Sequence, residues 1–435
     1  MKQLKQLKQF VPLILFLIFI MPFKAGAEEI IKKGESLNLE RCIEIALKRQ
    51  PAIIAAMNTA NASQSRIGQA QANYYPQIDW TSSASRNSVG PKTSFGFKTK
   101  PVLYNSYSTS AALNQNIYDF GKTAAQVKIQ RLNYDSSLSD VENTSEQIIL
   151  NVKQTYYGVL QAKRSRDVSA ETVKQFEQHL EQAKGFYEVG TKPKFDVTKA
   201  EVDLSNSKLN MIRAENAVRI AVASLNNAMG VPDAPGYEVE DNLSFKKYEM
   251  KFDDAVSKAY QNRPDLKSII VKKQAAESSV ELAKKGYFPV LTGTAGYDYA
   301  GNTFPLERGW NIGATFSFPV FNGFLTKYQV EEAKENLNVL RANEESLRQS
   351  VFLEVQQAYL NLKEAEDSIP TAELTVQQAQ ENFEIANGRY AAGVGNPIEV
   401  TDAEVLLANA KLSYIQALYN YKVSQSSLEK AMGLR

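Results

Sequence analysis

The chain has 435 residues, with 50 Lys and Arg against 48 Asp and Glu. Four of these lysines lie in the first 27 residues, so the remainder carries no basic footprint for nucleic acid, and no DNA or RNA partner is expected. One cysteine and one histidine cannot furnish a multi-residue His/Cys metal centre or an internal disulfide. We therefore predict a protein without catalytic residues, metal or cofactor.

Residues 1–27 have the pattern of a secretory signal peptide. Lysines precede an apolar run at 10–23, and the small residues at 25–27 mark the expected cleavage site. An uncleaved membrane anchor is the alternative, but this run is short for a membrane span and contains two prolines. No later stretch approaches about 18 apolar residues, so the mature chain has no predicted transmembrane helix, which leaves a transmembrane barrel open.

Two short helices are predicted next, at about 39–49 and 52–74, separated by Pro51. The lone Cys42 fits the apolar side of the first helix, so we predict that it is a core residue.

A β-hairpin is predicted over about 77–118. Large or apolar residues at 107, 109, 111, 113 and 117 alternate with small polar ones, which is the period of a strand, and a partner strand lies at about 78–88.

One long amphipathic helix is predicted from about 120 to 187, because the segment has no proline and its apolar or small residues recur at steps of three and four. At 1.5 Å per residue this helix would extend about 100 Å. His179 lies in it among Glu177, Gln178 and Glu181, where a solvated side chain is the better interpretation. The chain turns after Gly190 and returns as a second helix, completing a pair at about 120–229.

The second half of the chain repeats this order. Residues 228–230 recur at 431–433, and the same offset pairs Gly190 with Gly393, whereas upstream a longer offset pairs Pro51 with Pro264. We predict structural repeats at 28–230 and 251–435, joined by a linker at 231–250. The second repeat has short helices at about 252–262 and 265–287, a hairpin at about 290–321, and a long helical pair at about 324–432 in which Pro370 should kink the first helix.

The four strands determine the predicted architecture. Each is about ten residues long, as in a tilted membrane-spanning strand, with one apolar face and one small polar face. In the second hairpin Trp310, Ile312, Phe316 and Phe318 share the apolar face. A soluble half-buried sheet is the alternative. Four strands cannot close a barrel, so we predict that three chains combine them into a 12-stranded transmembrane β-barrel above a tube of long α-helices, in a mixed α+β membrane protein.

At this point the sequence resembles the TolC-type outer-membrane efflux protein family over nearly all of its mature length. The resemblance is carried by the opening LNLERCIEIALKRQPAIIAA, the YYP and YFP motifs before the strands, and the turn segments YEVGTKPKFDVTKAEV at 187–202 and YAAGVGNPIEVTDAEV at 390–405. It implies a homotrimer in the outer membrane of a Gram-negative bacterium, with its barrel in outer-membrane lipid and a helical tunnel in the periplasm. It also implies partners: a periplasmic adaptor protein and an inner-membrane pump or ABC transporter.

The resemblance also implies an acidic ring at the periplasmic entrance of the tunnel. By position the two acids of this ring are Glu399 and Asp402, and three chains would bring six carboxylates together, which should favour cations and raise some carboxylate pKa values. The alternative is that two acids in the first turn of a helix only complement its dipole.

The family closes this entrance with polar links between neighbouring helix tips. Tyr390 and Asp196 match members of that network, but the family's basic position is Gly395 here, so we consider three other cations as substitutes. These are Lys192, Lys194 and Arg389. Gly190 and Gly393 are predicted turn residues and candidate contacts for the adaptor.

The resulting prediction is a passive exit duct of a tripartite efflux or type I secretion system, carrying small molecules or proteins. The main alternative is a periplasmic coiled-coil structural or adaptor-like protein without a pore, which would have no reason to place large apolar residues on one face of a strand. An enzyme is a weaker alternative, because Glu399 and Asp402 could be an acid/base pair only in a pocket, and no pocket motif accompanies them.

Overall fold

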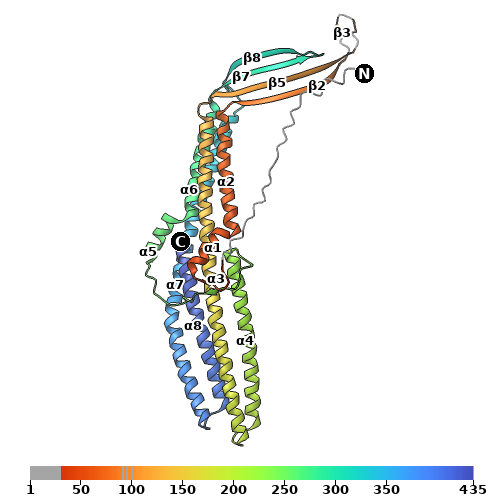
Figure 1. The fold of residues 1–435 in the computed structure, drawn as a ribbon. Coiled ribbons are helices and arrows are strands. Elements are labelled where there is room, and N and C mark those ends of the chain that lie inside the picture. The colour runs from red at the N-terminus through yellow and green to blue at the C-terminus, as the bar shows by residue number, and fades with distance from the viewer. Residues whose placement is uncertain (1–30, 91–92, 95–96, 99–100, 435) are drawn as a thin grey trace, which may run out of the picture.

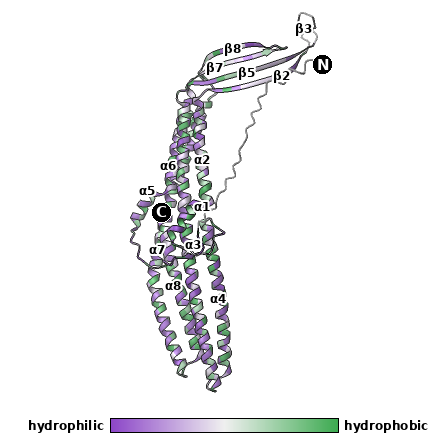
Figure 2. Ribbon diagram, viewed as in Figure 1, coloured by the Kyte–Doolittle hydropathy of each residue, from purple (hydrophilic) through white to green (hydrophobic). Residues whose placement is uncertain are grey.

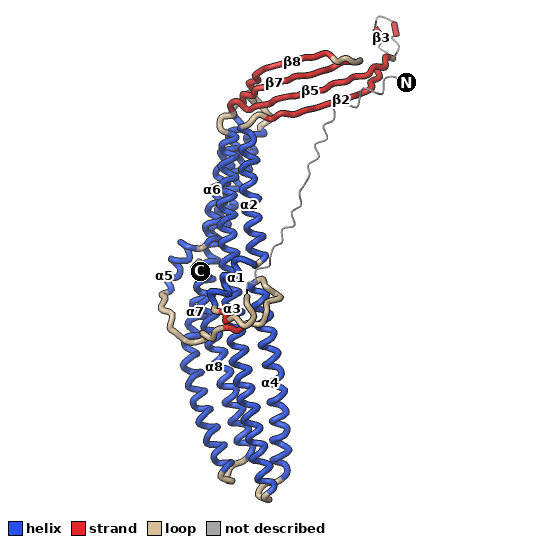
Figure 3. Tube along the Cα trace, in the orientation of Figure 1, coloured by secondary structure: helices blue, strands red, loops and turns tan. Residues whose placement is uncertain are grey.

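The computed structural model describes residues 31–90, 93–94, 97–98 and 101–434. The predicted signal peptide lies outside the described residues. The molecule is a long rod, with a β-sheet at one end, two helical tips at the other, and a belt of short elements around the middle (Figures 1 and 3).

Two helices of 67 residues each form the length of the rod. They are α3 (Lys122–Glu188) and α7 (Leu325–Ala391), and each corresponds to about 100 Å at the rise of an α-helix. Both long helices were predicted and are confirmed. The helix assignment of α7 continues without a break through Pro370 to Ala391. The turn that follows contains Gly393 in a left-handed conformation, with φ of 81°.

Shorter helices complete two further lines along the rod. In the half near the sheet, α2 (Pro51–Gln71) and α6 (Pro264–Lys284) pack on α3, whereas in the other half α4 (Lys194–Met229) and α8 (Pro397–Ala431) return from the tips (Figure 1). Each chain therefore has four helical lines. Among the described residues no helix combines the length and apolar character needed to cross a bilayer, and hydrophilic residues are spread along all of them (Figure 2).

The main hydrophobic core lies in the middle of the rod, where α1 (Leu39–Arg49) and α5 (Phe252–Asn262) cover the long helices. Cys42 is fully buried in this core, as predicted. The segment between the repeats is tied to α3 and α8 by two tyrosine hydroxyls: Tyr156 of α3 donates to Glu240 O at 2.7 Å, and Tyr421 of α8 donates to Lys246 O at 2.6 Å. Short elements complete the chain: β1 (Ser36–Leu37), which pairs with β6 (Glu238–Val239), and the 3-10 helices η1 (Ala72–Tyr74) and η2 (Lys285–Tyr287).

The sheet contains the four predicted strands in the antiparallel order β2-β5-β7-β8. Their bounds are β2 (Gln77–Val89), β5 (Val102–Tyr118), β7 (Val290–Gly301) and β8 (Glu307–Ser317), with a small ladder of β3 (Thr93–Ser94) and β4 (Phe97–Lys98) beyond them. The register places Trp80, Ala111, Tyr297 and Trp310 in one row across all four strands. Trp80 is 72% exposed and Trp310 74% exposed, so one face of the sheet presents large apolar groups outward. The hairpins and their period-two pattern are confirmed.

Candidate functional site at the helical tips

Two tight turns lie at the end of the rod opposite the sheet, where α3 leads into α4 and α7 into α8 (Figure 1). Gly190 and Gly393 adopt φ of 77° and 81°, a left-handed conformation that favours glycine. Gly190 N donates to Tyr187 O at 2.9 Å, and Gly393 N donates to Tyr390 O at 2.9 Å. Both glycines are exposed, so they set the geometry of two equivalent turns at the surface.

The second tip is closely packed at the start of α8. The Asn396 side chain caps the helix by accepting from Ile398 N at 2.9 Å, with Pro397 in the first turn. Gly395 is buried, and a Cβ at this position would lie 2.6 Å from Tyr390 N. This turn therefore has no room for the basic side chain that the resemblance places at 395.

The acidic pair lies on the first two turns of α8. Glu399 and Asp402 are both exposed in the single chain. Arg389, at the end of α7, lies 3.8 Å from Glu399, and both side chains are about half exposed, so this ion pair is weak. Two acids are thus presented to solvent beside a narrow helical tip.

Known proteins resemble the chain over most of its length. The sequence model of the family described as "Outer membrane efflux protein" matches residues 42–231 and 255–434. The chain belongs to this family.

Two relatives and one solved structure illustrate the similarity. The outer membrane protein TolC of Escherichia coli (strain K12) is 25% identical over 428 residues, covering 92% of this chain and 83% of TolC. The protein CyaE of Bordetella pertussis is 23% identical over 385 residues, covering 85% of this chain and 78% of CyaE. A crystal structure of CusC, which was studied for transmembrane channel formation, has a TM-score of 0.79 at 19% identity and covers 91% of this chain and 92% of its own. The chain thus combines membership of the outer membrane efflux protein family with the fold of the CusC channel.

In this outer membrane efflux protein, three of the latch candidates meet between the two tips. Lys192 of the first tip donates from Nζ to Gly395 O of the second at 3.2 Å, and the same amine lies 5.8 Å from the centre of the Tyr390 ring. Tyr390 is fully buried, and its pKa is raised by burial and by the nearby charge of Asp196. Lys192 thus brings a cation from the opposite tip to Gly395, the position at which the resemblance predicts a basic residue.

The other two latch candidates are placed differently. Lys194 is exposed at the start of α4, and Arg389 contacts Glu399 within its own tip. In the part of the chain that the structure describes, neither side chain forms a hydrogen bond or ion pair with the opposite tip.

Polar contacts that the sequence did not reveal join the two hairpins above the tips. Thr401 Oγ1 of α8 donates to Asp203 Oδ2 of α4 at 3.1 Å, and Lys199 binds the same carboxylate at 2.7 Å. Further up, Lys411 of α8 binds Glu171 of α3 at 2.8 Å. The only available signal was weak: these residues are polar and lie beside the apolar helix stripes, which is common on solvated helices as well.

The prediction of a solvated His179 is wrong. This side chain is only 6% exposed, and its ring packs against that of Tyr390 with centroids 4.9 Å apart. Its acidic and amide neighbours in sequence misled the prediction, because they lie on other sides of α3. His179 shares the buried face of Phe176 and Ala183, three and four residues away.

Proposed function

We propose that three copies of this chain assemble around a threefold axis into a passive exit duct in the outer membrane. The observation that carries the proposal is the four-stranded sheet, which has one apolar face and continues directly into helices of about 100 Å. In this assembly residues 28–230 and 251–435 are two similar parts of the wall, 231–250 joins them, and 1–27 is removed on export.

The edges of the sheet support the threefold assembly. Within the described chain β2 pairs only with β5, and β8 only with β7. An unpaired strand edge cannot be left in lipid, because its N–H and C=O groups have no partner there. Pairing β8 of one chain with β2 of the next removes every edge and gives twelve strands, well within the range of bacterial barrels. The row from Trp80 to Trp310 would then face outer-membrane lipid.

The helices support the same arrangement. On α4, Ile212 is 63% exposed and Ile220 is 59% exposed, although both are large and apolar. Such a stripe on one helix is expected to contact a neighbouring chain. Three chains with four helical lines each would enclose a continuous tube below the barrel.

The tips would then form the entrance of the duct. Six carboxylates from Glu399 and Asp402 would surround a narrow aqueous mouth and favour cations over anions. Lys192, Tyr390 and Asp196 would hold the two tips of each chain together, and Gly190 and Gly393 would lie on the outermost surface, where an adaptor can dock.

The partners are inferred from the length of the structure and from family membership. A duct that ends in the periplasm needs a periplasmic adaptor and an inner-membrane transporter to deliver its cargo. Family membership supports an efflux pump, and a type I secretion transporter is the other partner class that such a duct could serve.

A periplasmic coiled coil without a pore is the competing function. It accounts for the long helices, but it leaves the exposed Trp80 and Trp310 row without a purpose.

The test is reconstitution of the purified protein in a planar bilayer, together with chemical crosslinking in detergent. We expect discrete conductance steps and a crosslinked trimer. A soluble monomer that gives no conductance would overturn the proposal. As a control, replacing Trp80 and Trp310 with Asp should abolish insertion while leaving the helical circular-dichroism signal in place, since both side chains are exposed on the sheet.

A further inference from the structure

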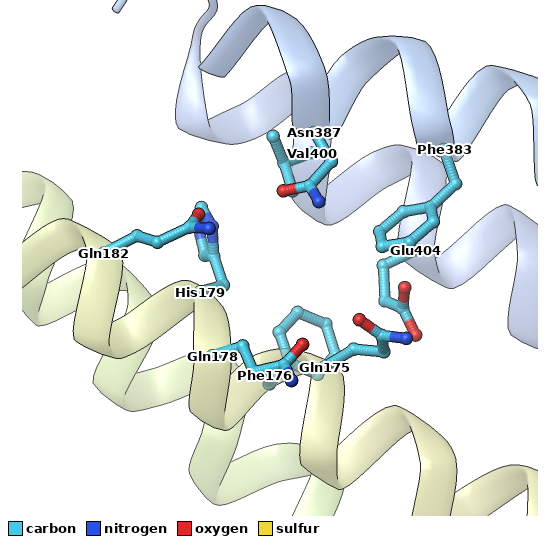
Figure 4. Close-up of a pocket in the computed structure, with 9 residues that line it drawn as sticks. All are labelled: Gln175, Phe176, Gln178, His179, Gln182, Phe383, Asn387, Val400 and Glu404. Atoms are coloured by element: carbon cyan, nitrogen blue, oxygen red, sulfur yellow. The ribbon is translucent and has the colours of Figure 1, made fainter. Parts of the chain in front are cut away.

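A small polar cavity lies at the seam between the two helical hairpins, a short distance above the tips. His179 and Gln182 of α3 reach it from one side, and Asn387 of α7 and Glu404 of α8 reach it from the other (Figure 4). Its volume is about 20 Å³, which is enough for one water molecule. The cavity therefore lies in the interface between the α3–α4 hairpin and the α7–α8 hairpin, which would open if the two hairpins separated.

Unpaired polar atoms gather at this seam. Among the described residues, four buried side-chain atoms have no hydrogen-bond partner: His179 Nδ1, Gln182 Oε1, Tyr390 OH and Glu404 Oε2. Three of these residues line the cavity, and the fourth, Tyr390, packs on the His179 ring. Buried polar groups without partners are rare and costly in proteins. In the described residues this seam therefore differs from the apolar core, because its packing leaves polar atoms without a protein partner.

Glu404 is the most unusual group in the cavity. It is only 3% exposed, whereas Glu201, its counterpart in the first repeat, is exposed on α4. Burial raises the pKa of Glu404 from 4.5 to about 7. The charge of Glu171 on α3 raises it further, and Lys411 on α8 opposes this. Lys411 is itself paired with Glu171, so its effect on the pKa of Glu404 is smaller than the effect of burial.

The other titratable groups at the seam also favour their neutral forms. Burial lowers the pKa of His179, assisted by Lys199 of α4, while Asp203 and Asp196 of α4 act in the opposite direction. Burial also raises the pKa of Tyr390 on α7. The packed seam is thus built for an uncharged carboxyl and an uncharged imidazole.

We infer that this cavity is a proton-sensitive joint, at which the proton on Glu404 keeps the α7–α8 hairpin packed against α3. Separation of the hairpins exposes the carboxyl to water, where it ionises. The inference rests on the proposed function, because in a channel this separation would widen the entrance.

The direction of the pH effect follows from linkage. Packing raises the pKa of Glu404, so its contribution to the packed state is complete below pH 4.5 and is lost as the pH rises through about 7. His179 acts oppositely: packing lowers its pKa, so its contribution is present above pH 6.5 and is lost as the pH falls. The joint is therefore tightest at mildly acidic pH and loosens above about pH 7.

The experiment compares wild type with Glu404→Gln, which keeps the side chain neutral at every pH. Open and closed dwell times are recorded for both trimers in planar bilayers at about pH 5 and about pH 8. At about pH 5 the two open-to-closed ratios should differ by only a few-fold, because Glu404 still keeps most of its contribution to the packed state at that pH. At about pH 8 the ratio of the variant should be at least about tenfold lower, since a pKa difference of one unit already corresponds to a tenfold change. Glu201→Gln is the matched control and should behave as wild type.

Equal ratios for Glu404→Gln and wild type at both pH values would overturn the inference while leaving the channel intact. Infrared spectra of the same trimers give a readout that does not depend on conductance. At about pH 6 the protonated-carboxyl band should be weaker in Glu404→Gln than in wild type. The additional band of wild type should disappear as the pH rises through about 7. If neither protein conducts, the proposed channel fails, and the infrared band alone decides the joint: its absence overturns the inference, and its presence supports it.

Discussion

The helices α4 and α8 are copies of one ancestral segment, yet the structure buries them differently. Helix α4 packs on α3 and exposes most of its remaining surface, whereas α8 lies against both α7 and α3. Glu201 is exposed and its counterpart Glu404 is buried, while Asp196 is buried and its counterpart Glu399 is exposed. The comparison teaches that duplication fixes the shape of an element, whereas its position in the assembly determines which of its faces carries function.

The largest expected effect tests this difference in burial directly. Ile415 on α8 is 7% exposed, whereas its counterpart Ile212 on α4 is 63% exposed. Ile415→Ala should destabilise the chain by about 2–5 kcal/mol, because it leaves a cavity in a packed helix interface. Ile212→Ala should leave the single chain intact and weaken only the trimer. Hydrogen exchange along α8 and the heat stability of the trimer on gels separate the two effects; equal loss of protection along α8 in both variants would refute the comparison.

The turns give the next largest effect. Gly395→Ala should destabilise the second tip by about 1–3 kcal/mol, because the new Cβ would overlap the backbone at Tyr390. Its counterpart in the first repeat is Lys192, and Lys192→Ala should remove only the contact to Gly395 O. Limited proteolysis at the tips measures both changes. If Gly395→Ala is cleaved no faster than wild type, the close packing at Gly395 does not stabilise the second tip.

A smaller effect concerns the hydroxyl that joins the hairpins. Thr401→Val removes the donor to Asp203 and should cost about 0.5–1.5 kcal/mol. The matched control is Thr198→Val, since that counterpart donates only to Lys194 O in its own helix. Hydrogen exchange of α8 amides near the tip should increase in the first variant alone. Identical exchange in the two variants would show that the contact does not hold the hairpins together.

The smallest effect on stability is expected at the acidic pair. Replacing Glu399 with Gln and Asp402 with Asn removes charges from the start of α8 and should cost at most about 1 kcal/mol. The same change should weaken cation selectivity and block by multivalent cations in a planar bilayer. If stability falls slightly but selectivity and block are unchanged, the acids only complement the helix dipole and the ring does not exist.

Regular elements with strong periodicity were predictable residue by residue. The absence of proline and the steps of three and four between apolar residues indicated α3, and the strict alternation around Trp310 indicated β8. The core position of Cys42 followed from the same reasoning. The signals are local, so a single sequence suffices to read them.

The candidate site was predictable only in part. The turns at Gly190 and Gly393 could be read from the sequence, because left-handed backbone favours glycine. His179 was misread and the role of Asp203 was missed, since both depend on which side of a long helix faces the other hairpin. On a helix that is polar around most of its circumference, composition does not identify that side.

The sequence by itself determined the repeated order of elements, the length of the helices and the alternating faces of the strands, because each follows from the preferences of neighbouring residues. Tertiary structure alone decided that α8 is enclosed while α4 is not, that Lys192 reaches the carbonyl of Gly395, and that Glu404 lies beside His179 in a polar cavity. These relations join residues about 200 positions apart, and packing between two hairpins is what brings them together.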